Sequence, residues 1–548
     1  MIHKAIAIAL IGATSLANEQ AAAKEHNSWR IDSGEEWNGA SRELNGLNGL
    51  AVENNTLSPT GKEGTYHSKL QRFKKKRTAQ AITLTASTRW DNWQPTKKKV
   101  CPPTMGDAPI FLAKGPNDYW ILGRNKAPRK AGFESKPATL EGFDIELKTT
   151  PYPNLFNAPG GLKKSAGGYH AWQSRDMVNW VHHGCVTAKH AKWSTTAEFV
   201  DGKAYIYYDF PNDQDPHLYI DDDLTDGKPG KDVGLAFKDP SDGSDCVIIR
   251  DLDGKFHLIY EDWSPINAGK HSWDSPLAGH AVSDDGISDF KILTPAVDER
   301  TKPTGKFIEY PHPHWHQEDP ENFPARVAAK QDPKQNPKQD PKQDPKQDPK
   351  QDPKDDPKQD PKAKIKAKSK RAFAKYEVHE PEQHAYGDWA AIAIGGQYYL
   401  AADYHPIHDK IRIGLFTSPG LDQKFEFIGE LGSGHPDPDI GFAEGQFYLL
   451  NQTKHDYVSP GPWVEKVEAR VGVDTTNDGK ADTWSDWSEL KESYDHIKGF
   501  SKQIKRIPAS LDLSELPAAY GFCFELKLQD TTTNASKPIL ESVEISFK

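Results

Sequence analysis

Acidic residues recur at one place in a pattern that this sequence repeats five times. In four copies an aspartate follows a small residue or a proline, and it precedes an apolar stretch, a glycine turn and an aromatic-rich stretch. If these acids converge, their mutual repulsion separates their pKa values, so that one can accept a proton while another delivers one. The pattern therefore predicts an acid–base centre formed by Asp107, Asp245, Asp388, Asp437 and Asp439, to which the second copy contributes Thr195, Thr196 and Glu198.

β-Hairpins are the elements that must position these acids. In each copy a polar turn separates two stretches with alternating apolar residues, which is typical of a two-stranded hairpin. A third strand follows three of the hairpins, from Tyr169, Gly279 and Ile413, and a shorter outer strand completes a four-stranded blade. Blades arranged radially protect their own edges, and the first strand of each blade lines a central channel. We therefore predict an all-β chain in which residues 101–460 form a five-bladed β-propeller.

The remaining segments predict smaller modules and an exported protein. Residues 1–17 carry Lys4, an apolar run and a small-residue cleavage site, as a signal peptide does, and no other run approaches the roughly 20 apolar residues of a membrane span. The product is therefore expected to be secreted or periplasmic, with no membrane partner. Residues 18–100 are expected to be an N-terminal accessory region packed on the propeller, and residues 461–548 a C-terminal β-sandwich-like module. Tandem QDPK tetrapeptides at residues 331–362 predict a disordered or polyproline-II-like insert.

Composition narrows the classes of ligand. The formal net charge is −10, with acids and bases interspersed, which disfavours a nucleic-acid partner. The 4 cysteines are widely separated, which excludes a Cys-x-x-Cys metal site and a dense disulfide scaffold. The 15 Trp and 19 Tyr supply flat amphipathic rings, which stack on sugars as well as fill cores. A carbohydrate ligand is consistent with all three observations.

Two of the acid-bearing segments resemble those of the glycoside hydrolases of family 43 and, more distantly, family 117. Gly106-Asp107-Ala108-Pro109 is similar to the Asp-Pro start of blade one in family 43, whose aspartate is the general base. Asp245 stands nine residues before Gly254, and SDCVIIRDLDGK resembles that family's blade-three segment, whose aspartate orients the proton donor and tunes its pKa. The resemblance covers roughly residues 105–452. It implies a five-bladed propeller that hydrolyses glycosidic bonds, with Asp107 as base and Asp245 as modulator.

The proton donor departs from the family pattern. Family 43 begins the first strand of blade four with a glutamate, whereas this sequence has Gly387-Asp388. Three candidates stay open: Asp388 itself, Glu380 or Glu382 just before it, and Glu309, which precedes the repeat insert in the sequence Glu-Tyr-Pro-His. Glu382 and Asp388 are preferred because a proton donor needs a fixed position at a strand end. The family's inverting mechanism implies two catalytic carboxyls roughly 6.5 to 9.5 Å apart.

Aromatic and histidine side chains near the predicted channel are candidates for binding the sugar. Trp172, Trp263 and Trp389 could stack on sugar faces, with packing in the core as the alternative. The histidines expected to contact substrate are His170, His312, His384 and His435. The sequence His-x-His-x-His that starts at His312 also allows a zinc or nickel site, but its prolines favour an irregular loop. No cofactor is therefore expected for catalysis.

A further candidate for a metal site lies in the C-terminal module. Asp474, Asp478 and Asp482 are spaced like ligands of an EF-hand-type calcium loop, with Gly479 at the sixth position. The final glutamate of such a loop is out of register. A structural calcium ion and an ordinary Asx-rich turn both fit this segment.

The leading hypothesis is a secreted glycosidase acting on an extracellular plant or algal polysaccharide or its oligosaccharides. A polysaccharide lyase is the first alternative, since channel residues such as His170, Tyr208 and His312 could abstract a proton beside a uronate carboxylate. A non-catalytic carbohydrate-binding propeller is the second, favoured if the absent blade-four glutamate means a lost proton donor. The sugar and the linkage stay undetermined, because specificity lies in loops grafted on a common fold.

Overall fold

The computed structural model describes most of the chain. The described residues are 27–41, 46–86, 93–126, 137–161, 168–191, 193–209, 215–241, 244–263, 275–311, 373–380, 384–406, 409–434, 436–453, 455–459, 466–529 and 538–548. For residues 107, 308–311 and 373–377 only the backbone is described. The predicted signal peptide and the QDPK insert lie outside the described residues.

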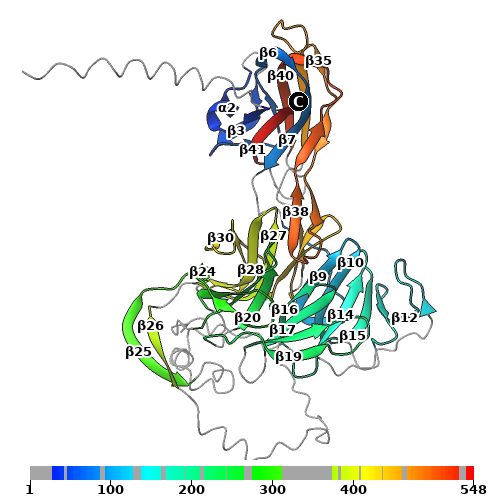
Figure 1. Cartoon of the computed structure of the whole chain (residues 1–548), viewed down its shortest axis with the longest axis vertical. Helices are drawn as coiled ribbons and strands as arrows, with labels where there is room; N and C mark the ends of the chain where they lie inside the picture. The colour runs from blue at the N-terminus through cyan, green and yellow to red at the C-terminus, as the bar shows by residue number, and fades with distance from the viewer. Residues whose placement is uncertain are drawn as a thin grey trace, which may run out of the picture. The chain divides into compact units, whose positions relative to one another are not determined.

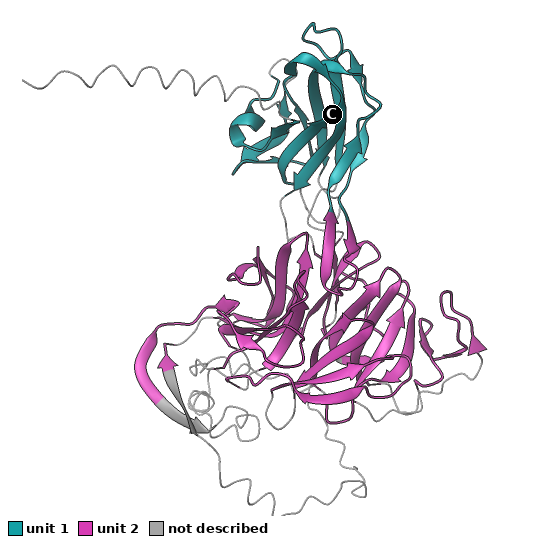
Figure 2. Cartoon of the chain, in the orientation of Figure 1, with its two compact units in different colours: residues 1–92, 462–493, 507–548 teal, residues 93–461, 494–506 magenta. Residues whose placement is uncertain are grey.

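The chain divides into two compact units, coloured separately in Figure 2. The larger unit comprises residues 93–461 and 494–506, and the smaller unit comprises residues 1–92, 462–493 and 507–548. Both consist almost wholly of β-strands (Figure 1), and the one α-helix among the described residues is α2 (Gly34–Asn38). The prediction of an all-β chain is confirmed at this level. Within the described ranges, no helix is long and apolar enough to cross a membrane.

The five predicted hairpins are present in the larger unit. Each joins the first two strands of a sheet in antiparallel register. In three of them both turn residues have positive φ, as two-residue hairpin turns require: Asp201-Gly202, Gly395-Gly396 and Glu444-Gly445. The hairpins are β9 (Met105–Gly115) with β10 (Asp118–Asn125), β16 (Ser194–Val200) with β17 (Lys203–Asp209), β20 (Ser244–Arg250) with β21 (Phe256–Glu261), β27 (His384–Ile394) with β28 (Gln397–Pro406), and β31 (Asp439–Ala443) with β32 (Gln446–Leu450).

Further strands extend each hairpin outward. The predicted third strands are observed as β14 (Tyr169–Ser174), β22 (Leu277–Ser283) and β29 (Arg412–Ser418). The sheet of β14 continues outward through β15 (Trp180–Cys185), β13 (Leu155–Asn157), β12 (Leu147–Thr149) and β11 (Pro137–Ala138). In the sheet of β22, both β23 (Lys291–Ile292) and β24 (Val297–Asp298) pair with β22. The sheet of β29 ends with β30 (Glu426–Leu431). The second sheet continues through β18 (Pro216–Asp221) and β19 (Lys231–Leu235), and a separate pair is formed by β25 (Pro303–Pro311) and β26 (Phe373–His379).

The first strands of these five sheets contact one another in a closed circle. Strand β9 contacts β16, β16 contacts β20, β20 contacts β27, β27 contacts β31, and β31 contacts β9. The last sheet is completed by β8 (Gln94–Pro95), which pairs with β33 (Tyr457–Ser459) beside β32. Asp439 adds a bond across the same seam, because its Oδ2 accepts the backbone N–H of Phe111 at 2.5 Å. The circle is thus closed by joining early and late parts of the chain.

The first strands are buried on both sides. All residues of β31 are buried, as are most residues of β16 and β20. A strand covered on both sides reads as a continuous apolar run rather than as an alternating one. Acids at the starts of these strands therefore stand out in the sequence. The four cysteines are also buried, and none is bonded to another.

The smaller unit is a pair of sheets built from both ends of the chain. One sheet orders β3 (Leu50–Glu53), β4 (Thr56–Pro59), β41 (Leu540–Phe547), β7 (Ala79–Ala86) and β39 (Ala509–Asp512), with β1 (Ser28–Ile31) also on β41. The other orders β2 (Leu47–Asn48), β5 (Glu63–His67), β40 (Ala519–Gln529), β34 (Val467–Asp474) and β35 (Thr483–Trp484), with β36 (Ser488–Leu490) on β34 and β6 (Gln71–Arg77) on β40. One hydrophobic core joins the two sheets.

This arrangement differs from the predicted boundaries. Residues 18–100 were expected to pack on the propeller and residues 461–548 to form a module of their own, but N-terminal and C-terminal strands are combined within both sheets. The alternating pattern of β7 or β41 marks which side chains face a core, and it carries no information about a partner strand hundreds of residues away. Residues 494–506 form a second departure, because they belong to the larger unit, where β37 (Ser493–His496) and β38 (Gln503–Ile507) extend the sheet of β27.

Candidate active site

Three aspartates at the starts of first strands share an uncommon backbone conformation. Asp245 has φ 37°, Asp388 has φ 50° and Asp437 has φ 39°. Residues other than glycine seldom adopt this left-handed region, and they do so mainly where the surrounding structure holds them there. Bulges accompany two of them, between Ser244 and Val247 and between Gly387 and Ala390. A bulge re-aims the side chain that it carries, so these carboxylates are turned by the same device in successive sheets.

A buried acid of the preceding sheet holds each of these aspartates by its backbone N–H. Asp209 Oδ2 accepts Asp245 N at 3.3 Å, and Glu261 Oε1 accepts Asp388 N at 3.0 Å. Asp403 Oδ1 accepts Asp437 N at 2.9 Å. Each acceptor lies on the second strand of a sheet and each donor starts the next sheet. The six acids therefore form three pairs between sheets, together called the relay. In each pair a carboxylate of one sheet holds the backbone N–H of an aspartate in the next sheet.

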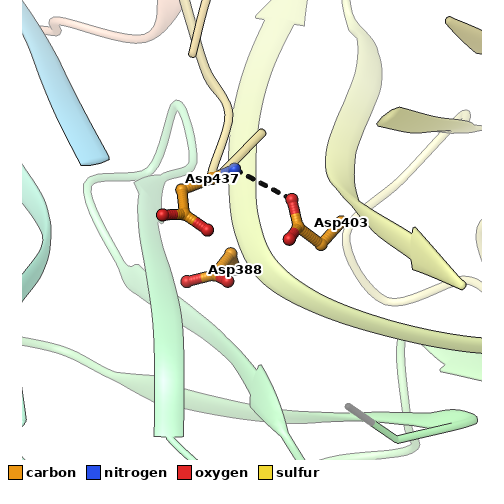
Figure 3. A group of neighbouring side chains, drawn as sticks. All are labelled: Asp388, Asp403 and Asp437. Carbon is orange, nitrogen blue, oxygen red and sulfur yellow. Dashed lines mark hydrogen bonds between the residues drawn. The ribbon is translucent and has the colours of Figure 1, made fainter. Parts of the chain in front are cut away.

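The carboxylates of Asp388, Asp403 and Asp437 point toward one another (Figure 3). One oxygen from each lies within 4.8 Å of the others, and within the described ranges this is the one group of three His, Cys, Asp or Glu residues gathered so closely. Oxygen ligands in such a group suit a hard cation such as Ca²⁺, and protons shared among the carboxyls satisfy the same geometry. Asp388 is half-buried, whereas Asp403 and Asp437 are buried.

Burial and repulsion between charges favour the protonated forms of Asp388 and Asp209. The pKa of Asp388 is raised well above its ordinary value, first by burial and then by the charges of Asp437, Asp245, Asp403 and Glu261. Burial and the charge of Asp245 likewise raise the pKa of Asp209. A carboxyl that holds its proton more tightly than usual, beside other carboxyls, has the property that a proton donor needs.

The predicted catalytic acids are placed as follows. Asp388 lies in the group with Asp403 and Asp437, and Asp245 is near enough for its charge to raise the pKa of Asp388, after burial and the charge of Asp437. Asp107 lies in β9, whose residue Gly106 is opposite Arg124, but its side chain lies outside the description. Glu309 lies in β25 opposite Lys375, in the separate two-stranded sheet rather than at a first strand. Glu382 lies outside the described residues, and Asp388 is the candidate that the described group of carboxylates contains.

Two acids expected in the centre have other partners. Asp439 accepts backbone N–H groups of Phe111 and Ile440, and Glu198 accepts the N–H of Ser501 at 2.8 Å. Both side chains are buried.

The predicted sugar-binding side chains are mostly buried. Trp172 is 0% and Trp389 3% exposed, which leaves neither ring a face for a sugar; both were candidates for stacking and instead pack in cores. Trp263 is also buried, and its Nε1 donates to Glu261 Oε2 at 2.9 Å, so it holds the acid that holds Asp388. The half-buried His384 pairs its Nδ1 with the hydroxyl of Tyr404 at 2.9 Å.

His170 is buried as well, and its Nδ1 lies 3.0 Å from Nε2 of His182. Burial lowers the pKa of His170 to about 4, so its imidazole is neutral at physiological pH. Tyr208, which the lyase hypothesis invoked beside it, lies in a core cluster. His312 and His435 lie outside the described residues.

Several site residues were not predicted. Asp209, Glu261 and Asp403 are the acids of the relay, and the sequence carried a signal for them, because each follows the aromatic or apolar end of a second strand in YYD, IYE and AAD. Trp193 was not among the predicted sugar-binding residues. It is 45% exposed directly before β16, and the guanidinium of Arg124 lies 4.9 Å from its ring.

The aspartates of the suspected calcium loop cap the loop's own backbone. Asp474 accepts N–H groups from Asn477, Asp478 and Gly479, and Asp482 accepts the N–H of Thr475. These bonds account for an Asx-rich turn. A calcium ion stays an untested expectation for this segment.

No protein-family model and no curated protein matches this chain. Among solved structures, it is similar to the α-L-arabinofuranosidase CtGH43 of Clostridium thermocellum ATCC 27405, at 9% identity, over 62% of this chain and 80% of that chain, with a TM-score of 0.32. It is also similar to a GH43_1 enzyme from Xanthomonas citri, at 11% identity, over 72% of this chain and 94% of that chain, with a TM-score of 0.32. A third similar structure is the endo-arabinase from Bacteroides thetaiotaomicron VPI-5482, at 10% identity, over 66% of this chain and 96% of that chain, with a TM-score of 0.33. The resemblance to family 43 glycoside hydrolases is thus found among structures as well as in the motifs, and at this level it assigns no activity to this chain.

Proposed function

We propose that this protein is an exported glycoside hydrolase that cleaves an extracellular plant or algal polysaccharide or its oligosaccharides. The observation that carries the proposal is the state of Asp388, a half-buried carboxyl whose pKa is raised by burial and by neighbouring acids. Glycosidases that invert or retain configuration need one carboxyl that is protonated and one that is not. The signal-peptide pattern of residues 1–17 supports export.

The larger unit is proposed to be a five-bladed propeller. The closed circle of contacts among β9, β16, β20, β27 and β31 supports this arrangement, as does β8, which completes the last sheet with the start of the unit. In such a fold the starts of the first strands lie around one mouth of the channel. The acids of the relay and Trp193 would then surround one substrate site.

In the proposed mechanism Asp388 protonates the oxygen of the leaving group as the glycosidic bond breaks. Burial, followed by the charges of Asp437 and Asp245, raises the pKa of Asp388 and so favours the proton on it before that moment. The second carboxylate deprotonates the water that attacks the anomeric carbon from the opposite face. Asp403 and Asp437 lie within 4.8 Å of Asp388, closer than the roughly 6.5 to 9.5 Å that an inverting pair needs to admit water. The base is therefore proposed to be Asp107, on the first strand β9 of another sheet.

The proposal is tested by incubating the purified protein with a panel of plant and algal polysaccharides and measuring new reducing ends. The wild-type protein is expected to release sugar from at least one of them, and Asp388→Asn and Asp245→Asn to lower turnover by about 10²-fold or more, as loss of acid–base catalysis does. Asp253→Asn, at an exposed turn residue, is the matched control and should keep wild-type turnover.

Three results would contradict the proposal. Wild-type turnover in Asp388→Asn would show that Asp388 is not the proton donor. An unsaturated product absorbing in the near ultraviolet would identify a lyase. Retention of a polysaccharide without any product would identify a binding protein.

A further inference from the structure

Residues 494–506 enter the larger unit although the chain on both sides of them belongs to the smaller unit. This axial segment bonds to four of the five first strands. Ser501 N donates to Glu198 of β16, Gln503 Nε2 donates to the carbonyl of Arg250 in β20, and His496 Nε2 donates to the carbonyl of Phe442 in β31. Strand β27 is bound through its own backbone, since Ala393 N donates to Lys502 O at 2.8 Å. The segment therefore ties together strands that otherwise meet only their two neighbours.

Lys502 is the centre of this segment. Its side chain is buried, with 2% of the residue exposed. Its Nζ donates to the hydroxyl of Thr196 at 3.0 Å and to the carbonyl of Ile248 at 2.7 Å, so it bridges β16 and β20. A buried ammonium loses its hydration and is retained only where acceptors and opposite charges replace the water.

The opposite charges come from Glu198 and Asp439, which lie outside the group of Asp388, Asp403 and Asp437. Glu198 is 1% and Asp439 6% exposed, and the charge of Lys502 lowers the pKa of both, against burial, which raises the pKa of Asp439 to about 6. Glu198 Oε2 has no hydrogen-bond partner among the described residues, so charge compensation is the main support for that oxygen. The other titratable groups facing this point, both on β20, are Arg250, whose charge lowers the pKa of Glu198, and the thiol of Cys246, which burial keeps neutral.

Lys502 also reaches every strand that carries a left-handed aspartate. Ile248 follows Asp245 in β20, Ala393 follows Asp388 in β27, and Asp439 follows Asp437 at the start of β31. Removing the Lys502 side chain would release the carbonyl of Ile248 and leave Asp439 without its counter-charge, while the backbone of Lys502 still holds the N–H of Ala393. None of the three aspartates needs to touch the lysine for its position to depend on it.

We propose that Lys502 is a positioning residue, the internal counter-ion that holds the strands bearing Asp245, Asp388 and Asp437 in their common arrangement. Its effect on turnover rests on the proposed hydrolase activity, but its effect on stability does not. The acid-bearing unit accordingly depends on thirteen residues, 494–506, that the chain supplies after it has left that unit.

The test compares the melting temperature of full-length Lys502→Met with that of the wild type between pH 5 and pH 8. Methionine keeps most of the volume and removes the charge, so Glu198 and Asp439 stay buried without compensation. Their pKa values in the folded state then rise further above the unfolded ones, and stability that is present at low pH is lost as pH rises through the folded pKa. The deficit in melting temperature is expected to be larger at pH 8 than at pH 5. The control is Lys505→Met, an exposed lysine of the same segment, which should show no such dependence.

The double variant Lys502→Met with Glu198→Gln separates charge from packing. Glutamine keeps an acceptor for Ser501 N and removes one of the two uncompensated charges, so the double variant is expected to regain melting temperature at pH 8 relative to Lys502→Met alone. If activity has been found, turnover should return in parallel. A deficit that is the same at pH 5 and pH 8 and is not relieved by Glu198→Gln, or failure of both variants to fold at pH 5, would overturn the proposal. A protein without hydrolase activity that still shows the pH-dependent deficit would refute the proposed function and leave Lys502 as the counter-ion.

Discussion

Asp388 draws its chemical character from the carboxylates around it. Four acids raise its pKa in addition to burial, and one of them, Glu261, also holds its backbone N–H. Glu261 therefore affects both the pKa of the Asp388 carboxyl and the position of the Asp388 backbone. Glu261 is itself fixed by the indole N–H of Trp263, so the conformation of one catalytic candidate is set by two residues of the preceding sheet.

Substitutions of Glu261 should separate these two effects. Glu261→Gln keeps an oxygen for Asp388 N but removes a negative charge, so the pKa of Asp388 should fall. The basic limb of the pH–activity profile would then move to lower pH with turnover at the optimum largely retained. Glu261→Ala removes the acceptor as well, which leaves a buried donor unsatisfied at a cost of about 1–3 kcal/mol, and turnover at the optimum should fall. Identical profiles for the two variants would mean that Glu261 does not act through Asp388.

The repeated acids could be predicted from the sequence, whereas the role of their partners could not, although each partner has a recognisable place at the end of a second strand. Asp245 and Asp388 stand at the same position of a recognisable hairpin, so spacing alone placed them together. Asp209 and Asp403 stand at the far ends of second strands, and their role follows from contact with the next sheet, which no period in the sequence expresses. Trp172 and Trp389 illustrate the reverse case, because composition cannot distinguish a ring that stacks on a sugar from one that fills a core.

At the scale of elements, pairs of buried histidines join neighbouring strands of two sheets. His170 of β14 meets His182 of β15, and His257 of β21 meets His280 of β22 at 2.9 Å between Nδ1 and Nε2. Burial lowers the pKa of His280 to about 3 and that of His257 below its ordinary value. Each pair shares one hydrogen between two neutral rings, an arrangement that a second proton would destroy.

The pair in the third sheet predicts how stability depends on pH. Because the folded pKa of His280 lies below the unfolded value, its contribution is fully present above about pH 6.5 and is lost as pH falls toward 3. His280→Gln keeps a hydrogen-bonding group and removes the titration. The drop in melting temperature between pH 7 and pH 4 should therefore be smaller in the variant than in the wild type, which calorimetry can measure. An equal or larger drop would show that the pair does not control this window.

Hairpins and their order were predictable because turn residues and apolar runs are local. Asp201-Gly202 and Glu444-Gly445 mark two-residue turns in the sequence, and both occur as such. The partner of β8 was not predictable, since two residues near position 94 pair with a strand near position 458. Pairings of that separation depend on closure of the whole circle of strands.

At the scale of the molecule, the chain passes between its two units more than once. The smaller unit takes strands from residues 27–86 and from beyond residue 466, and the larger unit takes back residues 494–506. Neither unit is therefore a continuous piece of sequence. A boundary does fall at residue 461, but the segment after it is not a module of its own, because it shares both sheets of the smaller unit with N-terminal strands.

A chain cut at residue 461 should consequently be unstable. A protein of residues 93–461 lacks the axial segment and with it several buried hydrogen bonds, each worth about 1 kcal/mol, so its melting temperature should fall by about 10 °C relative to the full chain. Deletion of residues 331–362, the QDPK insert, is the control and should leave the melting temperature unchanged. A fragment of residues 93–461 that melts with the full-length protein would contradict this account of the axial segment.

The central claim is that Asp388 delivers a proton to a glycosidic oxygen, and one comparison tests it most directly. Turnover by Asp388→Asn is measured on a natural glycoside and on an aryl glycoside whose phenol leaves without protonation. Turnover of the natural glycoside is predicted to fall by about 10²- to 10⁴-fold, whereas the aryl glycoside is cleaved at a rate much closer to that of the wild type. The basic limb of the pH profile is predicted to disappear. Equal losses on both substrates, or a natural glycoside cleaved at the wild-type rate, would contradict it.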